Sequence, residues 1–103
     1  MANSSTSELL AAKVRMPQHV VHRSFAAETV VLNLRTGQYH GLNPTAGRML
    51  DALQAGPTVG AAVPELAHHY GVETAQIEHD LIELCRSLID RGLIEIVDDR
   101  GGV

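Results

Sequence analysis

The chain of 103 residues is poor in aromatic and basic residues. Aromatic residues make up 3% of it, and none is tryptophan, so few rings are available on which nucleic-acid bases could stack. The formal net charge of −4 argues against a phosphate backbone and an anionic membrane surface, because both are bound largely through lysine and arginine. We therefore expect neither nucleic acid nor a membrane as a partner.

Cysteine and long hydrophobic runs are also scarce. Cys85 is the only cysteine, which excludes an internal disulfide and is compatible with a reducing cytoplasm. No run approaches the roughly 20 apolar residues that span a bilayer, and the first residues do not resemble a secretion signal. We expect a cytoplasmic protein.

The apolar fraction of 45% is enough for one modest core, so a single domain is expected. The two ends of the chain lack apolar periodicity. We expect a flexible N-terminal segment at residues 1–13, a folded domain over residues 14–97 and a flexible tail at residues 98–103.

Strand patterns fill the first half of this domain. Residues 19–25 are rich in β-branched side chains, and residues 29–34 alternate so that Val31 faces away from the other apolar side chains. Gly37 can adopt the positive φ of a short hairpin turn, after which residues 38–42 return antiparallel. This last strand is short and polar, which indicates an edge strand whose open backbone groups can accept another chain.

Helices are predicted after these strands. Asn43 can cap the first helix, and Pro44 at its first position loses no hydrogen bond. A second helix is predicted over residues 58–70, with Thr58 as its cap. Pro64 either kinks this helix or means that its regular part begins near Val63.

A third helix is predicted after a cap at Thr74 and ends before Gly92. Residues 93–97 form either a last short strand or an extended tail. The apolar stripe of the third helix consists of Ile77, Leu81, Leu84, Cys85 and Leu88. The second and third helices are joined by the short turn of a helix-turn-helix. The predicted fold class is α+β, winged helix-turn-helix-like, with an N-terminal three-stranded antiparallel sheet followed by three helices.

The sequence offers no catalytic or metal-binding set. His68 and His69 are adjacent and point about 100° apart on a helix, so they cannot easily hold one ion together with His79. Cys85 lies in the apolar stripe, where a thiol packs rather than reacts. We therefore expect no enzyme activity, no metal and no cofactor.

The exposed side of the third helix is acidic. Its carboxylates, Glu78, Asp80, Glu83 and Asp90, outnumber its single arginine, Arg86. A helix that reads a DNA groove needs arginine, lysine, asparagine or glutamine, whereas carboxylates repel phosphate. A winged-helix DNA-binding regulator is therefore the weakest of the alternatives.

Two stretches carry a family resemblance. Residues 30–53 read VVLNLRTGQYHGLNPTAGRMLDAL, and residues 79–96 read HDLIELCRSLIDRGLIEI, after a helical segment that ends in YGV. Together they resemble the PqqD-like family of precursor recognition elements for ribosomally synthesised and post-translationally modified peptides (RiPPs). The likeness is closest to the stand-alone leader-binding proteins of lasso peptide biosynthesis.

This resemblance implies that the protein binds the leader of a precursor peptide as an added antiparallel strand. The partners implied are that leader peptide, a cysteine-protease-like leader peptidase and a macrolactam synthetase. The implied binding strand is Gln38, Tyr39, His40, Gly41 and Leu42. The implied helix wall is Ile77, Asp80, Leu81 and Leu84. An alternative within the same family is a peptide chaperone for a radical-SAM enzyme, and an open edge also allows self-pairing.

Overall fold

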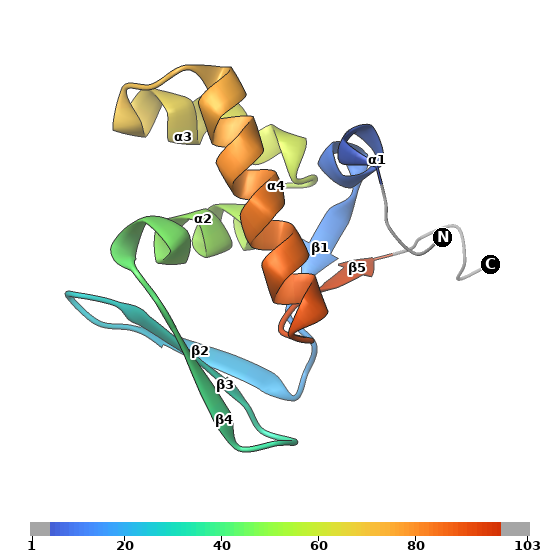
Figure 1. Cartoon of the computed structure of the whole chain (residues 1–103), viewed down its shortest axis with the longest axis vertical. Helices are drawn as coiled ribbons and strands as arrows, with labels where there is room; N and C mark the ends of the chain where they lie inside the picture. Colours follow the sequence, from blue (N-terminus) through green and yellow to red (C-terminus); the bar gives the residue numbers. More distant parts are fainter. Residues whose placement is uncertain (1–4, 98–103) are drawn as a thin grey trace.

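The computed structural model of the chain describes residues 5–97 (Figure 1). The helices are α1 (Thr6–Ala11), α2 (Pro44–Ala55), α3 (Val63–Tyr70) and α4 (Thr74–Asp90), with a 3₁₀ turn, η1 (Gly60–Ala62), directly before α3. The strands are β1 (Lys13–Arg15), β2 (Val20–Ser24), β3 (Thr29–Asn33), β4 (Gln38–Leu42) and β5 (Glu95–Val97). The predicted α+β class, with a three-stranded antiparallel sheet, is confirmed. No helix within residues 5–97 is long and apolar enough to cross a membrane.

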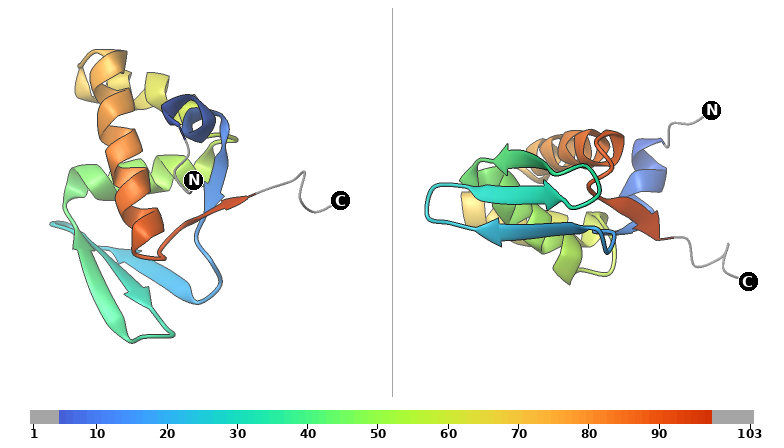
Figure 2. Two further views of the ribbon diagram at one scale, coloured as in Figure 1. Left: turned by 45° about the vertical axis from the view of Figure 1, so that its right-hand side comes forward. Right: turned by 90° about the horizontal axis from the view of Figure 1, so that it is seen from below.

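The main sheet has the strand order β2-β3-β4 and is antiparallel throughout. Gly37 has the positive φ of 76° expected for the turn between β3 and β4. A second, two-stranded sheet pairs β1 with β5, so the last strand lies beside a segment from the start of the chain (Figure 2). Among the strands that the structure describes, β4 pairs with β3 alone and is therefore an edge strand.

Residues 5–13 differ from the flexible segment that was expected at residues 1–13, whose first four residues lie outside the described part of the chain. Ser5 and Glu8 form a capping box at the start of α1, and Leu9 is 1% exposed within the core. Lys13 begins β1 and donates hydrogen bonds from Nζ to the carbonyl oxygens of Gln54 (3.0 Å) and Gly56 (2.7 Å). A segment too short to show periodicity is thus ordered by contacts with residues far along the chain. The expected flexible tail, residues 98–103, lies outside the described residues.

The inner face of the sheet packs against α2. On β3 the buried side chains are Thr29, Val31 and Asn33, whereas Val30 and Leu32 lie half-buried on the outer face. A Cβ on Gly47 of α2 would come within 3.0 Å of the Thr29 Cβ, so the missing side chain lets helix and sheet approach closely. The two polar residues of this face are satisfied locally. For example, the Asn33 Oδ1 accepts a hydrogen bond from the Arg35 amide at 2.9 Å.

The helix starts follow the predictions except at two predicted caps, Thr58 and Thr74. Thr58 does not cap α3, whose N-cap residue is Ala62. The Asn43 Oδ1 accepts a hydrogen bond from the Ala46 amide at 2.8 Å, which confirms the predicted cap of α2. The regular part of α3 begins at Val63, so Pro64 lies in its first turn and does not kink it. Thr74 does not cap α4. It is the first helical residue, because the extended backbone that precedes the helix ends at Glu73.

Helix α4 crosses the helical layer and contributes most of its apolar stripe to the core (Figure 1). Ile77, Leu81, Cys85 and Leu88 are each at most 3% exposed. Leu84 is only partly buried, at the margin of the stripe. The stripe therefore has a buried centre and a partly exposed border.

Candidate functional site

The hydrogen bonds between β2 and β3 fix which residues of β3 face each neighbour. The Phe25 amide donates to the Glu28 carbonyl at 2.7 Å, and the Leu34 amide donates to the His19 carbonyl, also at 2.7 Å. In an antiparallel ladder, hydrogen-bonded pairs alternate with pairs that share no hydrogen bond. The even-numbered residues of β3 therefore bond to β2, and its odd-numbered residues are left for β4.

The same alternation identifies the open groups of β4. The odd-numbered residues of β3 are opposite Gln38, His40 and Leu42, whose backbone groups consequently point into the sheet. The amides and carbonyls of Tyr39 and Gly41 then point outward, along an edge that no described strand occupies. Both residues can pair with an added strand without loss of any bond inside the sheet.

The side chains of β4 alternate between the two faces of the sheet. Tyr39 is 71% exposed on the outer face, where it lies opposite Leu32 of β3. Leu42 is buried, and His40 is half-buried on the inner face. Gly41 has no side chain, so nothing projects from the outer face at this position. A Cβ there would come within 3.1 Å of the Glu28 carboxylate. The edge of β4 thus offers the backbone groups of Tyr39 and Gly41 to an added strand and carries one exposed aromatic ring.

An open groove of about 360 Å³ lies between the start of α2 and the middle of α4. Its lining residues are Asn43, Thr45, Ala46, Met49, Asp80, Glu83 and Leu84. Asn43 directly follows β4, so the groove begins where the open edge ends. Seen from below in Figure 2, β4 is the strand of the sheet on the side of α4, and β2 forms the opposite edge. Edge and groove together form one continuous candidate surface.

The structure divides the four residues expected to form the helix wall. Asp80 and Leu84 line the groove. Ile77 and Leu81 do not, because they are 3% and 0% exposed and belong to the core beneath it. The sequence pattern marked the whole apolar stripe, but the centre of a stripe is the part that a neighbouring helix covers. Both side chains are buried in this conformation, and their contact with a ligand stays a prediction.

Other residues of the groove were not expected from the sequence. Met49 lies on α2 and is 4% exposed, and only the structure shows that it lines the groove. Glu83 was interpreted as part of a solvated helix face. The signal that could have identified Glu83 is its position, since it lies three residues after Asp80 and beside Leu84 at the border of the α4 stripe.

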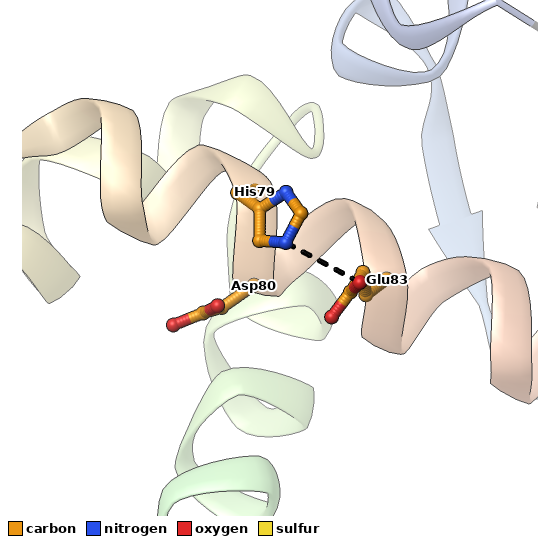
Figure 3. A group of neighbouring side chains, drawn as sticks. All are labelled: His79, Asp80 and Glu83. Carbon is orange, nitrogen blue, oxygen red and sulfur yellow. Dashed lines mark ion pairs between the residues drawn. The ribbon is translucent and has the colours of Figure 1, made fainter.

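The groove has an acidic wall. His79 Nε2 lies 3.3 Å from the Glu83 carboxylate one turn further along α4, and Figure 3 shows Asp80 beside this pair. Potential ligand atoms of these three residues all lie within 4.8 Å of one another, whereas His68 and His69 belong to no such group among residues 5–97. His79 and Glu83 are well exposed, and exposed acidic groups often cluster in this way without a metal ion.

Cys85 has no role in this surface. Its side chain is fully buried, and burial raises the pKa of the thiol from 9.0 to about 11. A thiol in such surroundings stays protonated and unreactive at neutral pH. This placement agrees with the packing role expected from the sequence.

The chain is similar to known proteins in both sequence and structure. Residues 28–94 match the family model of coenzyme PQQ synthesis protein D (PqqD). The solved structure of TbiB1 in complex with the TbiA(beta) leader peptide is similar, with 29% identity and a TM-score of 0.74. A lasso peptide synthetase B1 complexed with the leader peptide is also similar, with 27% identity and a TM-score of 0.75.

Each similarity covers 82% of this chain and 99% of the other chain. No curated protein matches the chain significantly. The family match spans most of the described domain, from the turn before β3 to the residues after α4. The chain belongs to the PqqD family, and its fold is that of the PqqD-like RiPP recognition elements.

Proposed function

We propose that this protein binds the leader segment of a ribosomally synthesised precursor peptide of the lasso type. The leader adds as an antiparallel strand to β4 and docks its N-terminal part in the groove between α2 and α4. The observation that carries this proposal is the open backbone edge at Tyr39 and Gly41, continuous with a groove that begins at Asn43. The likeness to two proteins solved with leader peptides supports it.

Strand pairing and groove docking contribute differently to affinity. Ordering a flexible peptide costs ~1–2 kcal/mol per residue of backbone entropy, while each backbone hydrogen bond returns only ~0.5–1.5 kcal/mol net. Burial of one aromatic side chain of ~150–250 Å² at ~25 cal/mol per Å² adds roughly 4–6 kcal/mol. The strand therefore sets register and direction, and a side chain held against Met49 and Leu84 supplies most of the affinity.

The protein itself acts without catalysis in this proposal. It works in the cytoplasm and delivers the bound precursor to a cysteine-protease-like leader peptidase and a macrolactam synthetase. A groove of about 360 Å³ is near the lower limit of ligand pockets, roughly 300–1,000 Å³, and suits one or two side chains of a peptide.

The test is an NMR titration of the isotope-labelled protein with the leader peptide of the precursor encoded beside it. We expect saturable binding, with new exchange protection at the amides of Tyr39 and Gly41 but no gain at His40, whose amide is already bonded. Leu84→Asp, which places a charge in the groove, should weaken binding and leave the fold intact. Absence of saturable binding would refute the proposal.

The family match also supports a second candidate, in which the chain presents a peptide to a radical-SAM enzyme. Both candidates use the same edge and groove, so mutations at the site do not separate them. The neighbouring genes do, because a peptidase and a macrolactam synthetase accompany the first function and a radical-SAM enzyme accompanies the second.

A further inference from the structure

The two walls of the groove differ in charge. The α2 wall is neutral, and together with Leu84 it supplies the apolar part of the surface through Ala46 and Met49. The α4 wall adds the carboxylates of Asp80 and Glu83, and no lysine or arginine lines the groove. A peptide that enters therefore meets an apolar surface bordered by negative charge on one side.

The two carboxylates differ in what they already bind. Glu83 is paired with His79, as Figure 3 shows. Asp80 is half-buried and has no hydrogen-bond or ion-pair partner among the described residues. When a peptide covers the groove, water is displaced from this carboxylate, and an unpaired charge is costly to desolvate. A cation on the peptide would replace the lost hydration with a charge-assisted hydrogen bond.

The direction of β4 determines where on the peptide such a cation belongs. β4 runs from the hairpin turn toward the groove, so an antiparallel peptide runs from the groove toward the turn. Its N-terminal part therefore occupies the groove. Asn43 follows Gly41 by two positions, and a strand rises ~3.4 Å per residue, so the groove lies about two or three residues before the peptide residue that pairs with Gly41.

We propose, on the basis of the function above, that the protein selects peptides with a lysine or arginine on the N-terminal side of the paired segment. The cationic head binds Asp80, with Glu83 beside it, and the aliphatic stem lies along Leu84. A neighbouring apolar side chain of the peptide occupies the surface of Ala46 and Met49. The acidic wall thus contributes to specificity.

The experiment is selection from a random peptide library displayed on phage. The unmodified protein should enrich peptides with lysine or arginine about two or three residues N-terminal to the paired segment. Asp80→Asn combined with Glu83→Gln should still select peptides, but without this preference. The matched control, Glu78→Gln combined with Asp90→Asn, removes the same charge from α4 outside the groove and should keep the preference.

The Kd values of one selected peptide and of its analogue with norleucine in place of the cation then give the contribution of the cation to affinity. We expect the unmodified protein to bind the analogue about two- to fivefold more weakly, the size expected for a partly exposed ion pair. The groove variant should bind both peptides equally. The difference should also shrink as salt is added, because salt screens exposed charges.

Two sets of outcomes separate this inference from the function on which it rests. An equal cation preference in the groove variant, or no preference in the unmodified protein, would overturn the inference alone. A preference on the C-terminal side would also contradict the antiparallel direction of the proposed function. Failure to select any peptide, or selection of the same peptides by a Tyr39→Pro variant, would overturn the proposed function itself.

Discussion

Replacing Tyr39 with proline tests directly whether the open edge of β4 binds a peptide backbone. Proline has no amide hydrogen, and its ring obstructs the edge that an added strand would occupy. Because the Tyr39 amide points away from β3, this change removes no hydrogen bond within the sheet. Proline is tolerated in an edge strand at such outward-facing positions. Binding should therefore fall while the fold persists.

The matched variants are Tyr39→Ala and His40→Pro. Alanine removes the same aromatic ring and keeps the amide, so the difference between alanine and proline isolates the backbone contribution. One lost hydrogen bond is worth ~0.5–1.5 kcal/mol, and the obstructed strand adds to it, so we expect a difference of about tenfold or more in Kd. His40→Pro deletes a bond to β3 and should lower stability by ~1–3 kcal/mol.

The assays are fluorescence polarisation with a peptide selected from the library and thermal unfolding of each variant. For a domain of this size, 1 kcal/mol shifts Tm by about 4–8 °C. Tyr39→Pro should leave Tm within a few degrees of the unmodified protein, and His40→Pro should lower it clearly. Equal Kd values for Tyr39→Pro and Tyr39→Ala would show that no peptide backbone pairs with this edge. A large loss of Tm in Tyr39→Pro would contradict the assigned register.

Three further predictions concern stability and reactivity. Gly47→Ala gains up to ~1 kcal/mol of helix propensity but forces a Cβ to within 3.0 Å of the Thr29 Cβ. We therefore expect urea unfolding to show a net destabilisation of about 1–2 kcal/mol. A gain in stability would contradict the close packing of α2 against the sheet. Lys13→Met removes the hydrogen bonds to the end of α2 and should lower the free energy of unfolding by ~1–2 kcal/mol. Its control, Arg15→Met, loses only an exposed ion pair and should lower it by less than about 1 kcal/mol. Equal losses would show that the Lys13 hydrogen bonds do not stabilise the end of α2. Burial of Cys85 favours the neutral thiol, so the contribution of this residue to stability should be complete below pH 9.0 and lost as the pH rises through a pKa of about 11. The thiol should react slowly with a thiol reagent in the native protein and rapidly in urea. Fast labelling of the native protein would contradict this burial.

The elements whose signals are local could be predicted from the amino-acid pattern alone. The alternation in residues 29–34, the glycine of the following turn, and the pair Asn43 and Pro44 each act within a few residues. Strands, turn and helix start therefore appear in the structure where the pattern predicted them. The apolar stripe of α4 was equally visible, because helical periodicity needs no information from the rest of the chain.

Which groups of these elements remain open to a ligand depends on packing between distant parts of the chain. Leu81 and Leu84 share one stripe in the sequence, but packing against neighbouring helices buries the first and leaves the second in the groove. The pairing of β1 with β5 and the contacts of Lys13 join residues about 40 to 80 positions apart, which no local pattern encodes. The outward amides of Tyr39 and Gly41 likewise depend on the register of three strands, since a shift by one residue would turn these groups into the sheet.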